Sequence, residues 1–445
     1  MATAPPQPDP DLQSALQFLR AGWFDRAEPL FRAAHGRYGD RPDVLHYLAV
    51  CASKRGALAE ASQLWRKALA KDPNEPMLSY NLGLAARGLG QFDEAAKRFR
   101  DTVRRQPGHI DARLALASIH IDQGKFAAAE RELAETVGVV EQIMQQPEGE
   151  RWKLVQARAR NMLGHVLYRV GNFATAIEVL DMAALDAGDD DVPRRAQILG
   201  DRALSLGGLG HHDEAIAEAR KALELAPQSA ILNHVLGFVL YFAGKPSEAI
   251  EAIEKALEID PDFAQAMQTL AIAKTASGKV DEAADILKRS LGRNPLNRNA
   301  VLQLSFLQIE KGDHAAAVET LTPYLKAVPE DARALNNQGL ALRGLKRFDE
   351  ARKALKKASR LAGEDPLVLT NLGQVLVDLG RAAEARALHE QALRGMPGDA
   401  RLLTNYGACL AALGETDRAR ETLDAALAAD PNNAEALAQR TQLDA

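Results

Sequence analysis

Aromatic residues, cysteines and long apolar runs are all scarce in this chain of 445 residues. Phe, Trp and Tyr together make up 5% of the sequence, whereas apolar residues as a whole make up 47%, so the core must consist largely of Ala and Leu. This apolar content excludes wholesale disorder. It favours closely packed helices, because Ala has no side-chain entropy to lose and lets neighbouring helix backbones approach each other.

The two cysteines, Cys51 and Cys409, are too few for a disulfide framework and fit a reducing compartment. The apolar run from Val235 to Ala243 is among the longest, and it is far shorter than the ~20 residues that span a bilayer. The first residues have neither the basic region nor the apolar stretch of a secretory signal. We therefore expect a cytoplasmic protein without membrane insertion.

An excess of positive charge is also absent, since 55 Lys and Arg stand against 60 Asp and Glu and the formal net charge is −5. Without a global positive field, a nucleic-acid partner is not expected. The sequence has no phosphate-binding loop, no paired metal-ligand motif and no nucleophile motif. We therefore predict no enzyme activity, no cofactor and no metal site.

What dominates the sequence is an internal repeat of 34 residues, which must be recognised before anything else. Twelve units begin at residues 8, 42, 76, 110, 157, 196, 230, 264, 298, 332, 366 and 400, and all but two of the spacings are 34. Unit position 20 is Ala in all twelve units, and position 8 is Gly or Ala in all but one, where Ser305 stands. Small residues at two such positions are typical of helices that cross closely.

Two further positions mark where helices end. Position 15 is Gly in every unit except at Lys346, as expected where a helix ends in a left-handed turn. Position 32 is Pro in eight units, where it would stop a second helix. Each unit is therefore predicted to be a helix, a Gly turn, a second helix and a loop.

This pattern resembles the tetratricopeptide repeat family, whose signature combines a Leu-Gly pair with Ala, an aromatic residue, Ala and Pro. The pairs Leu82-Gly83 and Leu163-Gly164 match it, as do Trp65 and Phe99 at the later aromatic position. The resemblance implies an all-α fold, an α-solenoid in which about twelve helix-turn-helix units and a C-terminal capping helix form a right-handed superhelix. It also implies a concave groove that holds partner peptides.

The repeat divides the chain into five expected segments. Units four and five are lengthened to 47 and 39 residues, which would change the superhelical pitch locally and form a hinge; a tolerated loop insertion is the alternative. The segments are a disordered tail at 1–9, units one to four at 10–135, the lengthened units at 136–195, units six to twelve at 196–433 and a capping helix at 434–445. Since these segments account for all 445 residues, we expect no catalytic domain among them.

In the family, first-helix positions 2, 5, 6, 9, 12 and 13 form the inner surface, and the resemblance carries this assignment over. In units seven to nine, large apolar residues occupy several of these positions, namely Phe238, Tyr241, Phe242, Ile272, Phe306 and Ile309. We interpret them as a patch that receives the apolar face of a helix or the anchors of an extended peptide. The alternative is that some of them pack as core.

Position 6 has a polar pattern. It is Asn81 in unit three and then, in the last five units, Thr269, Gln303, Asn337, Asn371 and Asn405. Because a carboxamide both donates to and accepts from a peptide backbone, stacked Asn side chains would hold an extended chain of any sequence. The pattern is similar to the Asn ladder in the repeat arm of O-GlcNAc transferases; the alternative is an ordinary polar helix surface. Nearby Arg333, Arg343 and Arg401 would favour an acidic partner segment.

Taken together, these features predict a non-enzymatic scaffold or adaptor that binds a protein or peptide partner in its groove. One alternative is a peptide-sensing signalling receptor that uses the hinge. Another is an accessory or substrate-recruiting subunit of a glycosyltransferase or secretion complex, suggested by the Asn ladder alone. The sequence leaves the partner, the pathway and the oligomeric state open.

Overall fold

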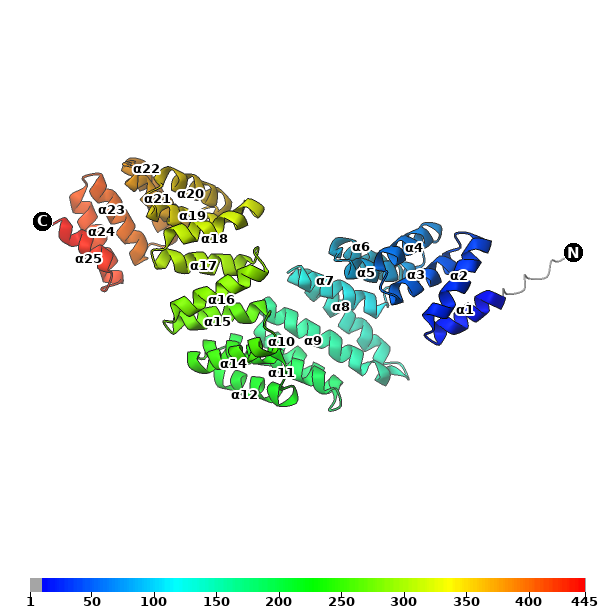
Figure 1. Cartoon of the computed structure of the whole chain (residues 1–445). Coiled ribbons are helices and arrows are strands. Elements are labelled where there is room, and N and C mark those ends of the chain that lie inside the picture. Colours follow the sequence, from blue (N-terminus) through cyan, green and yellow to red (C-terminus); the bar gives the residue numbers. More distant parts are fainter. Residues whose placement is uncertain (1–9, 445) are drawn as a thin grey trace. The chain divides into compact units, whose positions relative to one another are not determined.

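The computed structural model describes residues 10–444, and within that range every regular element is helical (Figure 1). It contains twenty-five α-helices and one short 3₁₀-helix. The tail predicted at 1–9 and the last residue of the predicted cap lie outside the described residues. The chain divides into two compact parts, residues 1–228 and 229–445, which are considered separately below.

In the first part, consecutive helices pack against each other as hairpins. Its helices are α1 (Pro10–Arg20), α2 (Phe24–Tyr38), α3 (Pro42–Lys54), α4 (Leu58–Lys71), α5 (Pro76–Gly88), α6 (Phe92–Arg105), α7 (Ile110–Asp122), α8 (Phe126–Met144), η1 (Gly149–Trp152), α9 (Lys153–Arg169), α10 (Phe173–Ala187), α11 (Val192–Gly208) and α12 (His212–Leu225).

The second part repeats the same arrangement. Its helices are α13 (Ala230–Phe242), α14 (Pro246–Ile259), α15 (Ala264–Ala276), α16 (Val280–Arg293), α17 (Arg298–Glu310), α18 (His314–Ala327), α19 (Ala332–Gly344), α20 (Phe348–Ala362), α21 (Pro366–Asp378), α22 (Ala382–Gly395), α23 (Ala400–Ala412), α24 (Thr416–Ala429) and α25 (Ala434–Gln442). The odd-numbered helices α13 to α23 begin at the predicted unit starts, and α25 is the predicted cap.

The small residues lie at the helix crossings, as predicted. Ala at position 20 is fully buried in all twelve units: Ala27, Ala61, Ala95, Ala129, Ala176, Ala215, Ala249, Ala283, Ala317, Ala351, Ala385 and Ala419. Gly237 shows why position 8 must be small. A Cβ atom there would lie 2.3 Å from Ile253 Cγ1 and 3.0 Å from the Ala249 carbonyl oxygen. Position 8 therefore packs against position 24 as well as against position 20.

The turn inside each hairpin confirms the role of position 15. In the eleven units where this residue is Gly, its φ is positive, as at Gly312 with φ 84°. At Lys346 φ is 58°, and this is the one residue other than Gly with a positive φ among residues 10–444. The fold therefore forces a left-handed conformation on a side chain that disfavours it.

The extra residues of units four and five mainly lengthen helices. Helix α8 extends to Met144, so it has 19 residues, and the 3₁₀-helix η1 follows after a short turn. Helices α9 and α11 begin at Lys153 and Val192, each four residues before the predicted unit start. A hinge over 136–195 stays a prediction.

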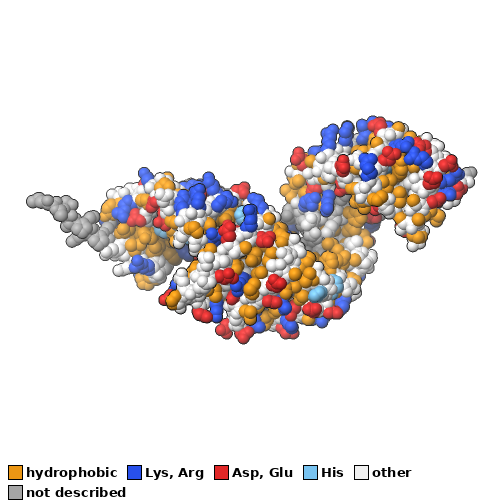
Figure 2. Space-filling view, turned by 180° about the vertical axis from the view of Figure 1, so that it is seen from behind, with side chains coloured by type: hydrophobic (Ala, Val, Ile, Leu, Met, Phe, Trp, Pro, Cys, Tyr) orange, Lys and Arg blue, Asp and Glu red, His pale blue; other side chains and the backbone are white. Residues whose placement is uncertain are grey.

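The first helices of the hairpins form the inner layer. Alternate helices that pack directly against each other are first helices, namely α9 with α11 in the first part and, in the second part, α13 with α15, α17 with α19, α19 with α21, and α21 with α23. Alternate helices converge on the concave side of a stack, so in the second part the first helices line the concave face, as α9 and α11 do in the first part. No helix within residues 10–444 has the length and apolarity that crossing a membrane requires. Figure 2 shows apolar, acidic and basic side chains interspersed over the face that it draws, so no single sign of charge covers that face.

Candidate functional site

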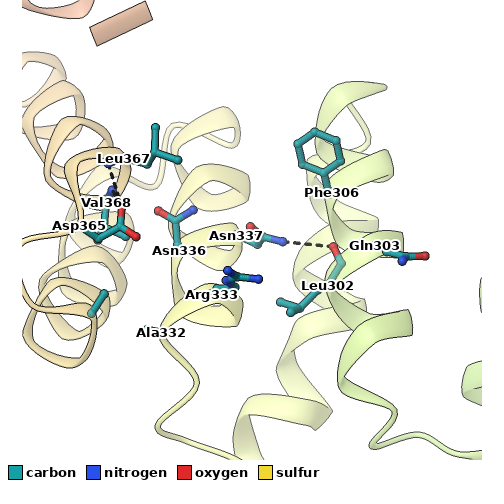
Figure 3. Close-up of a pocket in the computed structure, with 11 residues that line it drawn as sticks. Leu302, Gln303, Phe306, Ala332, Arg333, Asn336, Asn337, Asp365, Leu367 and Val368 are labelled. Atoms are coloured by element: carbon teal, nitrogen blue, oxygen red, sulfur yellow. Dashed lines mark hydrogen bonds between the residues drawn. The ribbon is translucent and has the colours of Figure 1, made fainter. Parts of the chain in front are cut away.

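The second part contains a groove along its first helices, made of two cavities that meet at Phe306. The first, called the apolar cavity here, has a volume of about 270 Å³ and is lined by Tyr241, Ile272, Thr275, Ala276, Gln303, Phe306 and Leu307. The second, called the polar cavity, has a volume of about 440 Å³ and is lined by Leu302, Gln303, Phe306, Ala332, Arg333, Asn336, Asn337, Ala362, Asp365, Leu367 and Val368 (Figure 3). Because Gln303 and Phe306 line both cavities, the two cavities are adjacent and together extend from α13 to α21.

The predicted apolar residues are divided between the groove and its rim. Tyr241, Ile272 and Phe306 meet around the apolar cavity. Beside them, the Phe238 and Phe242 rings lie 4.7 Å apart, and the Tyr241 and Phe242 rings lie 5.3 Å apart and nearly perpendicular. Ile309 is half-buried and lines neither cavity.

Exposure decides between a binding surface and core for these residues. Phe306 is 51% exposed and Phe242 is 57% exposed, so neither is core. Tyr241 is half-buried and packs against the buried residues of the hairpins that follow it, so it belongs partly to the core. The apolar cavity is therefore bordered by accessible side chains, and these side chains lie next to others that are packed in the core.

His234 supports the same region from within α13. Its Nε2 lies 2.9 Å from the Thr269 hydroxyl, which itself donates to the Gln265 carbonyl, so the imidazole donates this bond. Burial lowers the pKa of His234 to about 4, so the ring is neutral near pH 7. Thr269, the first member of the predicted ladder in this part, is thus buried and already bonded.

Three of the predicted Asn side chains form hydrogen bonds between neighbouring units. Asn337 Nδ2 donates to the Leu302 carbonyl at 3.3 Å and to Ser305 Oγ at 3.0 Å. Asn371 Nδ2 donates to Asn336 Oδ1 at 2.9 Å.

Between units eleven and twelve, Asn405 Oδ1 accepts from Gln374 Nε2 at 2.6 Å. Asn371 and Asn405 are 9% and 8% exposed. The first helices of units nine to twelve pack directly against each other, which brings these amides together. The ladder therefore links units, a role that sequence reasoning missed. Gln303 and Asn337 remain half-exposed in the groove, and Asn81 is half-buried in the first part of the chain.

The arginines along the groove differ in how far their charge is already paired. Arg298 Nε lies 2.5 Å from Asp331 Oδ2, and Arg343 Nε lies 2.5 Å from Asp378 Oδ2. Arg333 is exposed and lines the polar cavity, and within residues 10–444 its guanidinium has neither a hydrogen bond nor an ion pair. Of the three arginines predicted to favour an acidic segment, Arg343 is paired, and Arg401 is exposed and unpaired within residues 10–444 but lines neither cavity. Arg333 therefore combines an available charge with a place in the polar cavity.

The polar cavity also includes residues that were not predicted. Leu302 and Asn336 occupy position 5 of their units and Leu367 occupies position 2, so the family's inner positions could have identified them. Asp365 comes just before α21, where its carboxylate accepts from the Leu367 and Val368 backbone amides. No motif singled it out, because an N-cap is a common structural residue.

In each part, helical hairpins stack on their neighbours, and in the second part a groove lies along the first helices; this architecture is an α-solenoid built from helical repeats. Models of the tetratricopeptide repeat match residues 18–80, 208–271, 240–291, 274–338 and 376–443, with a second model at 330–398 and a third at 80–137 and 161–230. The chain belongs to the tetratricopeptide repeat family.

The chain also has similarity to solved structures. One is the anaphase-promoting complex hetero-tetramer Cut9–Hcn1, with 16% identity, 96% of this chain and 95% of that chain covered, and a TM-score of 0.47. Yeast Tom70 has 17% identity, 97% and 98% coverage and a TM-score of 0.47. A tetratricopeptide repeat protein from Parabacteroides merdae has 18% identity, covers 57% of this chain and all of its own, and has a TM-score of 0.48. No curated protein matches the chain at a significant level.

Proposed function

We propose that this repeat scaffold is a non-enzymatic adaptor of the cytoplasm that captures a segment of a partner protein in the groove from α13 to α21. The observation that carries the proposal is the contiguous pair of cavities around the exposed Phe306. Concave apolar sites with a few polar groups are the usual places where ligands bind.

The groove offers an extended chain two kinds of contact. An apolar side chain that enters the apolar cavity would be shielded by Tyr241, Ile272 and Phe306, and full burial of such a side chain contributes about 1.5–3 kcal/mol. Gln303 borders the same path, and its amide group can accept from and donate to a peptide backbone. Asn337 also borders the path and offers its Oδ1 as an acceptor, because its Nδ2 already donates to the preceding unit. This combination holds a segment through its backbone and selects it through one anchor.

Photo-crosslinking tests the location of binding. Phe306 is replaced by p-benzoylphenylalanine in the full chain, and the same replacement at Phe92 is the control, because Phe92 is a partly exposed aromatic residue on a second helix, at 42% exposure. The proposal expects a partner protein that crosslinks through position 306 and not through position 92. Equal crosslinking through both positions, or none through position 306, would rule out the groove as the binding site.

A further inference from the structure

Arg333 lines the polar cavity, and within residues 10–444 its guanidinium forms no ion pair. Arg298, at the start of α17, and Arg343, on α19, are each paired with an aspartate. Two aspartates lie close to Arg333 in the chain or in the cavity, and neither pairs with it within residues 10–444. Asp331 holds Arg298 and accepts from Tyr324 Oη, and Asp365 caps α21 and forms no ion pair with Arg333.

The groove continues beyond Arg333. The polar cavity reaches Leu367 and Val368 on α21, and the apolar cavity lies on the other side of Phe306. A chain that ended at Arg333 would leave the α21 end of the cavity unfilled. The shape therefore favours a chain that passes Arg333, with the carboxylate supplied by an Asp or Glu side chain.

The spacing of the helices fixes how far apart the two contacts are along the partner. Helices α17 and α19 pack directly, so their axes are roughly 8–10 Å apart, and the apolar cavity lies on the far side of α17. An extended chain advances about 3.3 Å per residue, and side chains an even number of residues apart lie on the same side of it. Four residues, or roughly 13 Å, meet both conditions.

We infer that the groove recognises an extended internal segment of a partner in which a large apolar residue and an Asp or Glu are four residues apart. The apolar side chain occupies the apolar cavity, and the carboxylate pairs with Arg333. This inference rests on the proposed function, because it names the chemistry of the segment that the groove captures.

A phage-displayed library of random twelve-residue peptides, selected on the full-length chain, tests both statements separately. The inference expects the selected peptides to share a large apolar residue and an acidic residue at a separation of four. Peptides that bind through the groove without an enriched acidic residue would overturn the inference and leave the proposed function standing. Peptides that bind the wild type and Phe306→Asp alike would overturn both.

Charge reversal then tests the role of Arg333 with a synthetic, fluorescein-labelled copy of the best selected peptide. Arg333→Glu should weaken binding by about tenfold or more in fluorescence anisotropy, because an ion pair is replaced by repulsion. Lys357→Glu is the charge-matched control, since Lys357 is exposed on the second helix α20 and has no ion pair within residues 10–444. A peptide whose acidic residue is changed to Lys should recover binding to Arg333→Glu. Equal loss in both variants, or no recovery, would overturn the inference.

Discussion

Replacing Asn337 by Ala tests whether the Asn ladder holds the units together. The side chain donates two hydrogen bonds to the preceding unit, to the Leu302 carbonyl and to the fully buried Ser305. A net contribution of about 0.5–1.5 kcal/mol for each bond predicts a loss of about 1–3 kcal/mol in the free energy of unfolding. Asn81→Ala is the matched control, because Asn81 occupies the same unit position and has no side-chain hydrogen bond within residues 10–444.

The tryptophans provide the assay. All three, Trp23, Trp65 and Trp152, lie in the first part of the chain, so their fluorescence follows that part while far-UV circular dichroism follows both. In urea, Asn337→Ala should lower the midpoint of the transition measured by circular dichroism. The midpoint measured by tryptophan fluorescence should not change, because repeats couple mainly to their neighbours. If Asn337→Ala were as stable as wild type to within about 0.5 kcal/mol, the side-chain hydrogen bonds of Asn337 would not stabilise the contact between units, and the reasoning would be refuted.

Two further predictions concern residues that depart from the repeat. Lys346→Gly should raise the free energy of unfolding by about 1 kcal/mol in urea, because it relieves a left-handed backbone at φ 58°; a lower midpoint would contradict this. His389 is fully buried, both of its ring nitrogens lack partners, and burial lowers its pKa to about 4. The folded pKa is below the unfolded value near 6.5, so the protein loses stability as pH falls from 6.5 towards 4, at up to about 1.4 kcal/mol per pH unit. His389→Leu copies Leu355 and Leu423 at the same unit position. It should raise the free energy of unfolding at pH 7 and make its loss between pH 7 and pH 5 smaller. Urea titrations in which the wild type and His389→Leu lose the same free energy of unfolding between pH 7 and pH 5 would contradict this.

The helices and their crossings could be predicted because a repeat depends on local spacing. Ala at position 20 and Gly at position 15 impose the same close contact and the same turn in unit after unit, so the pattern alone located them. The family resemblance implied which first-helix positions face inward, and the repeat register placed Tyr241, Ile272 and Phe306 at those positions.

What the sequence could not supply was how closely successive first helices approach. That approach decides whether a ladder amide faces the groove, as Gln303 does, or is buried against the next unit, as Asn371 is. It also decides which arginines are paired. Arg343 meets Asp378 one unit further on, and Arg333 has no acidic partner within bonding distance among residues 10–444. Both outcomes depend on the packing of whole hairpins and not on local pattern.

The affinity of the partner captured by crosslinking through position 306, measured against Phe306→Ala, tests the central claim most directly. Phe306 is shared by both cavities, so its removal should raise the Kd by about thirtyfold, the effect of losing about 2 kcal/mol at the centre of an interface. Phe92→Ala should leave the Kd unchanged, and both variants should retain the helical circular dichroism of the wild type. If Phe306→Ala bound the partner as tightly as Phe92→Ala, the groove between α13 and α21 would not be the binding site.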